Sequence, residues 1–134
     1  MRAYTIVNMY MQGIHAGIQS AHILSEMALD SASKPDHKSA ATFYSWATND
    51  KTLIVLNGGS NKNLRKMMDL IEPACDKLDL PFAYFTESEE ALDGALTGFG
   101  LIVPSRIYES GVANDYRTSE NSISSCLNLL QLAR

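Results

Sequence analysis

The stretch from Met11 to Asp30, MQGIHAGIQSAHILSEMALD, indicates more about the fold than any other part of the sequence. It follows an apolar, β-branched run, and its apolar residues recur with the period of a helix. Four of its polar side chains are spaced by four, three and four residues, so that they share one narrow stripe of that helix. They are His15, Gln19, His22 and Glu26. Because most of the other side chains are apolar or small, we expect a buried helix whose chemistry lies along this polar stripe.

The elements around this helix alternate between strand and helix. The run from Tyr4 to Met11 is rich in β-branched and aromatic residues and predicts a central strand. After a polar loop, the segment 39–50 predicts a short helix with Trp46 on its apolar face. The apolar run 52–56 predicts a strand that is buried on both faces. The third predicted helix, which is long, begins after Ser60, and the Ser60 hydroxyl can cap it.

The C-terminal half adds two strands and a last helix. The segments 82–86 and 98–103 are apolar and of strand length. The segment 105–117 has no clear period and is expected to form a loop or an extension. A hydroxyl residue at 118 or 119 then caps the last helix, which is expected to continue almost to the final residue. Its apolar face is formed by Ile123, Leu127, Leu130 and Ala133.

Taken in order, these elements read βααβαββα. This alternation requires a mixed sheet covered by helices on both faces, so the sequence predicts a three-layer α/β/α fold with a four-stranded mixed sheet. The length of 134 residues and the hydrophobic share of 46% are typical of one globular domain, here residues 1–134. No apolar run approaches the ~20 residues that a membrane span needs, and we expect a soluble, cytoplasmic protein with no membrane partner.

Charge and motif content restrict the class of function. The formal net charge of -4 disfavours a protein that grips polyphosphate, because such proteins usually show a basic excess. Cys75 and Cys126 lie in apolar helical patterns without a CxxC motif. They are expected to be small buried side chains, with a disulfide or a nucleophile as the alternative. The sequence also lacks a complete G-x-G-x-x-G, GK[ST] or G-x-S-x-G motif, which disfavours a nucleotide-binding loop and a nucleophile elbow.

The segment from Gly13 to His22, GIHAGIQSAH, resembles the signature of the peptidyl-tRNA hydrolase II family, in which a Gly-Lys pair, small residues and then Gln-x-x-His open the first helix. Later features fall in the same order, namely Trp46 before TLIVL, the capped helix SNKNLRKMMDL and the C-terminal LNLLQLAR. The resemblance covers about residues 4–104 and the last helix. It implies hydrolysis of the ester between peptide and tRNA without metal or cofactor, with tRNA or peptidyl-tRNA as partner and a homodimer as assembly.

The resemblance also assigns roles to five positions of this chain. The family's lysine falls on His15, its aspartate on Glu87, and the one remaining hydroxyl of its Gly-Thr-x-Thr stretch on Thr97, so these three are the catalytic candidates. Its glutamine and histidine fall on Gln19 and His22, the candidates for substrate binding. Histidine in place of lysine replaces a permanent cation by a side chain that is mostly neutral at neutral pH. Glutamate in place of aspartate moves the carboxylate by one methylene.

Each candidate residue also has a structural interpretation. His15 and Glu87 either help to activate water, or they are a solvated helix end and a loop charge. A histidine at the position of His22 is more often a hydrogen-bonded structural group, and Gln19 either holds substrate or satisfies a buried amide. A metal site on His15, His22 and Glu26 is disfavoured, because seven helical residues separate the two histidines by ~10 Å.

Two functions therefore remain in competition. The first is hydrolysis of a peptidyl or aminoacyl ester of tRNA by activated water. The second is a non-catalytic binding or assembly module that keeps the fold and has lost the lysine. The acidic residues Glu89, Glu90 and Asp93 lie beside the expected mouth of the site and would repel tRNA phosphates, which weakens the first hypothesis.

Overall fold

A five-stranded mixed sheet forms the centre of the molecule, with the strand order β3-β4-β1-β2-β5. The structure is a computed structural model that describes residues 1–87 and 95–133. β1 is parallel to β2, whereas β4 is antiparallel to both β1 and β3, and β5 is antiparallel to β2. The strands are β1 Arg2–Val7, β2 Leu53–Asn57, β3 Phe82–Thr86, β4 Leu96–Val103 and β5 Gln131–Leu132. The mixed α/β class expected from the sequence is therefore confirmed.

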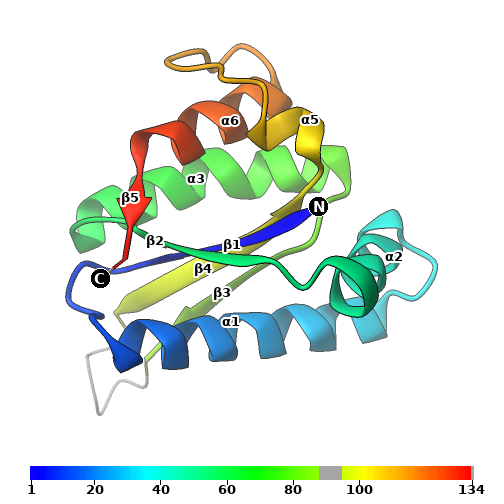
Figure 1. The fold of residues 1–134 in the computed structure, drawn as a ribbon, viewed down its shortest axis with the longest axis horizontal. Helices are drawn as coiled ribbons and strands as arrows, with labels where there is room; N and C mark the ends of the chain where they lie inside the picture. Colours follow the sequence, from blue (N-terminus) through cyan, green and yellow to red (C-terminus); the bar gives the residue numbers. More distant parts are fainter. Residues whose placement is uncertain (88–94, 134) are drawn as a thin grey trace.

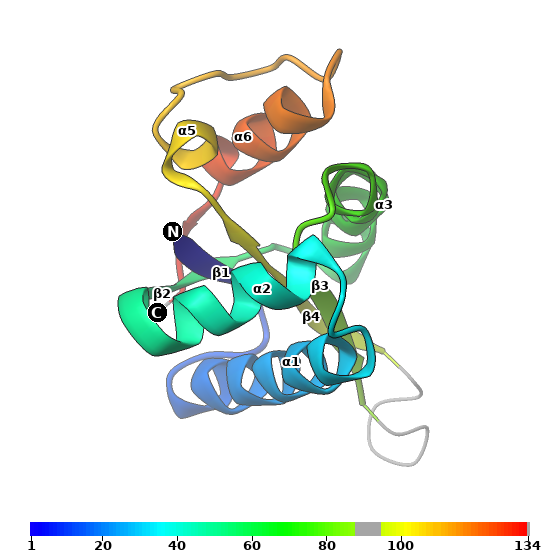
Figure 2. The ribbon, with the colours of Figure 1, turned by 90° about the vertical axis from the view of Figure 1, so that its right-hand side faces the viewer.

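Helices cover both faces of this sheet. Figure 1 shows α1 and α2 on one face and α3 with α6 on the other, and Figure 2 shows the same layers from the side. The described helices are α1 Ile14–Ser33, α2 Lys38–Ser45, the π-helix η1 Trp46–Asp50, α3 Asn61–Leu78, α5 Ser105–Tyr108 and α6 Ser119–Leu129. This arrangement buries apolar side chains in two separate layers.

The two apolar layers are divided by the sheet. Between the sheet and the α3/α6 face, Phe99 and Leu101 of β4 pack with Ile71 and other buried residues. On the α1/α2 face, Ile102 of β4 packs with Ile23 of α1 and with the aromatic residues of α2 and η1. Every residue of β4 is buried, because this strand has a neighbour on each side and a helix layer on each face.

Two glycines of β4 let α1 lie close to the sheet. A Cβ on Gly100 would lie 2.7 Å from the Ile23 Cγ2 atom and 3.0 Å from the Tyr4 carbonyl oxygen. A Cβ on Gly98 would lie 2.9 Å from the Ile23 Cδ1 atom. Ile23 is completely buried in the space that these glycines leave. The close approach of helix and strand at this point therefore depends on the missing side chains.

Several local predictions are confirmed. The Ser60 hydroxyl accepts a hydrogen bond from the Asn63 backbone N–H at the start of α3, and Thr118 caps α6 in the same way through Asn121. Phe82–Thr86 forms a strand with the expected bounds. Trp46 is buried, and its indole N–H donates to the Thr52 carbonyl at 2.8 Å.

The prediction of four strands was wrong, because the last helix ends earlier than expected. α6 stops at Leu129, Leu130 has an extended backbone, and Gln131–Leu132 forms β5. The Ala133 N–H then donates to the Val55 carbonyl at 2.9 Å. The outer edge of β2 offers unpaired backbone groups, and the end of the chain satisfies them as a strand instead of continuing as a helix.

Two burial predictions were also wrong. The strand β2 is not buried on both faces, since Leu53 is 37% exposed and only Leu56 is fully buried. Its outer neighbour β5 pairs only with Leu56 and Asn57, so the start of β2 stays near the surface. The helix α1 is likewise not buried all round, because Ile14 is 76% exposed on the side that faces away from the sheet. A helix in an outer layer packs on the sheet with one side only, so its opposite side is exposed to solvent.

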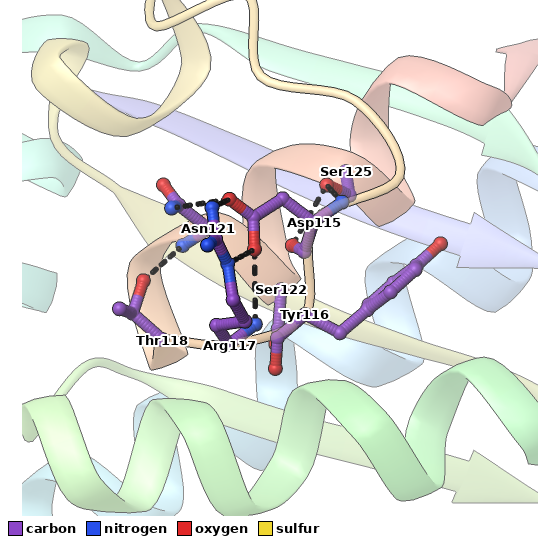
Figure 3. Close-up of polar contacts among 7 residues, drawn as sticks. All are labelled: Asp115, Tyr116, Arg117, Thr118, Asn121, Ser122 and Ser125. Atoms are coloured by element: carbon purple, nitrogen blue, oxygen red, sulfur yellow. Dashed lines mark hydrogen bonds and ion pairs between the residues drawn. The ribbon is translucent and has the colours of Figure 1, made fainter.

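The segment 105–117, expected to be a loop or an extension, begins with the short helix α5 and then packs on α6. Figure 3 shows how the second part is held. The Asp115 N–H donates to the Ser125 hydroxyl oxygen at 3.0 Å, and that hydroxyl is also 3.0 Å from the Asp115 carbonyl. The Ser122 hydroxyl donates to the Tyr116 carbonyl at 3.3 Å. Serines on α6 thus supply hydrogen bonds that anchor a segment without regular structure.

In the described part of the chain, no helix is both long and apolar enough to cross a bilayer.

Candidate functional site

Three of the five candidate residues meet at the carboxyl end of β3 and the amino end of β4. The Gln19 Nε2 atom of α1 donates to the Glu87 carboxylate at 3.2 Å. The Thr97 hydroxyl lies 3.0 Å from the Gln19 Oε1 atom and 3.0 Å from the Phe85 carbonyl oxygen. The resulting hydrogen-bonded chain, which we call the Gln19 chain, contains Glu87, Gln19 and Thr97. Residues 78 positions apart in the sequence are therefore in direct contact.

Burial fixes the inner part of the Gln19 chain. Gln19 is 6% exposed and Thr97 is 1% exposed, whereas Glu87 is half-buried. Because the Gln19 carbonyl oxygen faces the Thr97 hydroxyl, its amide nitrogen is directed toward Glu87. The Glu87 backbone N–H also donates to the Ala95 carbonyl at 3.1 Å. The carboxylate of Glu87 is thus held at the outer end of an ordered polar chain.

Asn8 supports the same region and was not among the residues that the sequence singled out. The expected strand reached Met11, but β1 ends at Val7, and the buried Asn8 side chain accepts a hydrogen bond from the Tyr10 N–H at 3.1 Å. Its own N–H donates to the Thr97 carbonyl at 2.9 Å. An asparagine that hydrogen-bonds two residues ahead is a turn signal, and it ends the strand here. Asn8 in the middle of an apolar run was the available sequence signal.

His22 lies beside the Gln19 chain without joining it. Its ring stacks on the ring of Phe85, with centroids 4.4 Å apart and planes 9° from parallel. The same Phe85 provides the carbonyl that faces Thr97. His22 is nevertheless an exposed residue. It is therefore an exposed side chain beside the Gln19 chain, packed on an aromatic ring.

His15 and Glu26 are the two members of the helix stripe that remain apart. Both are exposed. In residues 1–87 and 95–133, neither has an ion pair or a side-chain hydrogen bond to another residue. His15 lies four residues before Gln19, which places it one turn away on the helix. The stripe thus combines one buried amide with three exposed side chains.

The described residues contain no group of three histidine, cysteine, aspartate or glutamate side chains close enough to hold a metal ion. Cys75 and Cys126 are both unpaired and buried, in agreement with their interpretation as small core residues. Burial raises the pKa of both thiols above the ordinary value. A thiol with a raised pKa is a poor nucleophile, so neither cysteine is a candidate for covalent chemistry.

A cavity beside the sheet lies apart from the Gln19 chain. It has a volume of about 860 Å³ and runs along β3 between α1 and α3, where it reaches Phe85 and Glu26. None of the three residues of the Gln19 chain lines it. The acidic residues Glu89, Glu90 and Asp93, which the sequence places after Glu87, lie outside the described residues. The cavity and the polar chain are therefore two separate features that share the neighbourhood of Phe85.

A second polar cluster, around Asp115, has a structural role. Its carboxylate accepts hydrogen bonds from the backbone N–H, Nε and Nη2 of Arg117 and from the Nδ2 of Asn121, at 2.9 to 3.2 Å (Figure 3). Four donors occupy the acceptor sites of a carboxylate almost completely. This group has little capacity left for a ligand, and it serves to hold the loop on α6.

By its fold, the protein belongs to the mixed α/β class. Its Gln19 chain places the half-buried carboxylate of Glu87 at the carboxyl end of β3. Comparison of the chain with models of protein families and with curated protein sequences gives no significant match.

Proposed function

We propose that the protein is a divergent hydrolase of the peptidyl-tRNA hydrolase II type, which cleaves the ester between a peptidyl or aminoacyl group and tRNA. The observation that carries this proposal is the Gln19 chain, since Gln19, Glu87 and Thr97 are positions that the resemblance marks and they are in contact. In the proposed reaction, water attacks the ester carbonyl and transfers a proton to Glu87. The tRNA hydroxyl leaves with that proton, and a carboxylic acid is released.

The residues of the site have different roles in this proposal. Glu87 is the catalytic base, because it is the one ionisable side chain among the three residues of the Gln19 chain and is only half-buried. Gln19 and Thr97 are positioning residues, since each acts on the carboxylate through the hydrogen bonds described above. His15, in place of the family's lysine, would face the negative charge that develops on the ester oxygen. His22 is proposed to contact substrate at the rim.

Hydrolysis of an N-acetylaminoacyl-tRNA by the purified protein tests this proposal. We expect turnover that falls about 100- to 10,000-fold in Glu87→Gln, the range typical of a lost general base. Glu26→Gln is the control, because Glu26 is an exposed carboxylate on α1, the helix that carries Gln19, and lies outside the Gln19 chain; this variant should keep full activity. Thr97→Val should lower the maximal rate with little change in KM. A folded wild-type sample without turnover would refute the proposal.

One observation favours the non-catalytic alternative. His15, the position of the family's lysine, is exposed and has no hydrogen-bonding partner among the described side chains, so nothing orients it toward Glu87. His15→Lys distinguishes the two functions. A gain of hydrolysis would show that a cation was the missing group, whereas an inactive variant that still shifts tRNA in a salt-dependent gel assay would support a binding module.

The homodimer implied by the resemblance belongs to the same proposal. Sedimentation at several protein concentrations would measure it, and a monomer at every concentration would contradict it.

A further inference from the structure

The strand β3 presents an edge to which no described strand is paired. It pairs with β4 alone, and it stands at one end of the strand order. Figure 2 shows β3, beside β4, between the ribbons of α1 and α3. The opposite edge of the sheet belongs to β5, which has only two residues. β3 is therefore the longer of the two edges at which the sheet can grow.

The register of the β3–β4 pair shows which backbone groups face outward. The Pro81 carbonyl accepts a hydrogen bond from the Ile102 N–H, and the pairing continues as Ala83 with Gly100. Hydrogen-bonding residues alternate along an antiparallel strand, so the N–H and C=O groups of Phe82 and Tyr84 point away from β4. No described residue satisfies them. Pro81 and the register shift after Phe85 limit this free edge to a short segment.

The 860 Å³ cavity runs along this edge and is acidic on both sides of the strand. Apolar residues such as Phe82, Ala83 and Phe85 form its floor. Glu26 of α1 borders it on one face of the sheet, and Glu72 with Asp76 of α3 borders it on the other. These three carboxylates make no ion pair with a described residue, whereas Asp30 and Asp79 in the same lining are paired with Lys34 and His37.

From this arrangement we propose that β3 binds an extended, basic peptide segment of a protein partner by adding it to the sheet as a sixth strand. Backbone hydrogen bonds to Phe82 and Tyr84 would supply affinity. Side chains of an added strand alternate between the two faces of the sheet, so lysine or arginine residues on either face would meet free carboxylates. Tyr84 is 49% exposed at the centre of this edge and would pack against the incoming strand. This proposal does not depend on ester hydrolysis.

The binding test uses a labelled, end-blocked hexapeptide with the sequence Lys-Val-Lys-Lys-Val-Lys and fluorescence anisotropy at low salt. We expect saturable binding that weakens about three- to tenfold when Glu72→Gln and Asp76→Asn are combined, given the modest strength of exposed charge pairs. Asp69→Asn is the matched control, because Asp69 is exposed on the same helix but lies outside the cavity lining. It should bind like the wild type. An equally tight complex with the corresponding glutamate peptide would overturn the charge argument.

N-methylated peptides test the strand addition itself. Methyl groups on every second amide block one edge of the peptide and leave the other free, so such a peptide should still bind, whereas methylation of every amide blocks both edges and should abolish binding. On the protein, the unmodified peptide should slow amide hydrogen exchange at Phe82 and Tyr84. Tyr84→Pro, which removes an outward N–H and leaves the β4 pairing intact, should weaken binding. Undiminished binding of the fully methylated peptide, or self-association of the protein through this edge, would refute the proposal.

Discussion

At the scale of single residues, burial distinguishes the members of the polar stripe of α1, because only Gln19 is shielded from solvent. Helical spacing gives the direction of a side chain around the helix axis, and this spacing places four polar side chains along one side of α1, namely His15, Gln19, His22 and Glu26. Burial depends on what packs on that region. Only Gln19 lies beneath the end of β3, where Thr97 and Glu87 satisfy its amide. Helical spacing could not predict the contacts of Gln19, because they join elements far apart in the sequence.

A substitution at Gly100 tests how much the close packing of α1 on the sheet contributes to the free energy of unfolding. Gly100→Ala would place a methyl group 2.7 Å from Ile23 and 3.0 Å from a backbone carbonyl, so we expect a loss of about 1–3 kcal/mol of unfolding free energy from overpacking. Gly17→Ala is the matched control, since a Cβ there meets nothing within 4 Å and Gly17 lies inside α1. That variant should gain about 0.5–1 kcal/mol. Urea unfolding measures both, and equal effects would contradict the packing argument.

At the scale of elements, the sequence predicted those whose signals are local. The caps of α3 and α6 and the strand β3 follow from side chains within a few residues of one another. The segment 105–117 and β5 could not be predicted in this way. Each is fixed by a partner elsewhere in the chain, α6 in the first case and the edge of β2 in the second. The local sequence pattern of a segment does not show which distant element the segment will pair with.

The Asp115 cluster makes the anchoring of its loop depend on pH. Hydrogen bonds from Arg117 lower the pKa of Asp115 from 3.8 to about 2. A carboxyl group with a lowered pKa stabilises the fold above its ordinary pKa and loses that contribution as the pH falls through the folded value. We expect Asp115→Asn to lower the urea midpoint at pH 5 and to approach the wild type between about pH 4 and pH 2. Arg117→Gln should behave similarly, and a pH-independent difference would contradict this origin.

At the scale of the whole molecule, the two cysteines report on global opening. Cys75 is completely buried, and Cys126 is almost so, in the layer between the sheet and the α3/α6 face. Because the thiolate is the reactive form and burial raises the pKa of both thiols, we expect negligible reaction with a disulfide reagent at pH 8 in the native state. Two thiols should react promptly in denaturant. Rapid labelling of either cysteine without denaturant would show local opening of α3 or α6.

The pairing of β1 with β4 also determines the order in which the molecule can be assembled. These strands form the centre of the sheet, with Arg2 opposite Val103 and Val7 opposite Gly98, so nearly a hundred intervening residues separate the two partners. Closing so large a loop costs entropy before any contact repays it, which is typical of slow-folding topologies. During synthesis, β1 can pair with β2 long before β4 leaves the ribosome. Until then one edge of β1 remains open, and a nascent chain at this stage needs protection from aggregation.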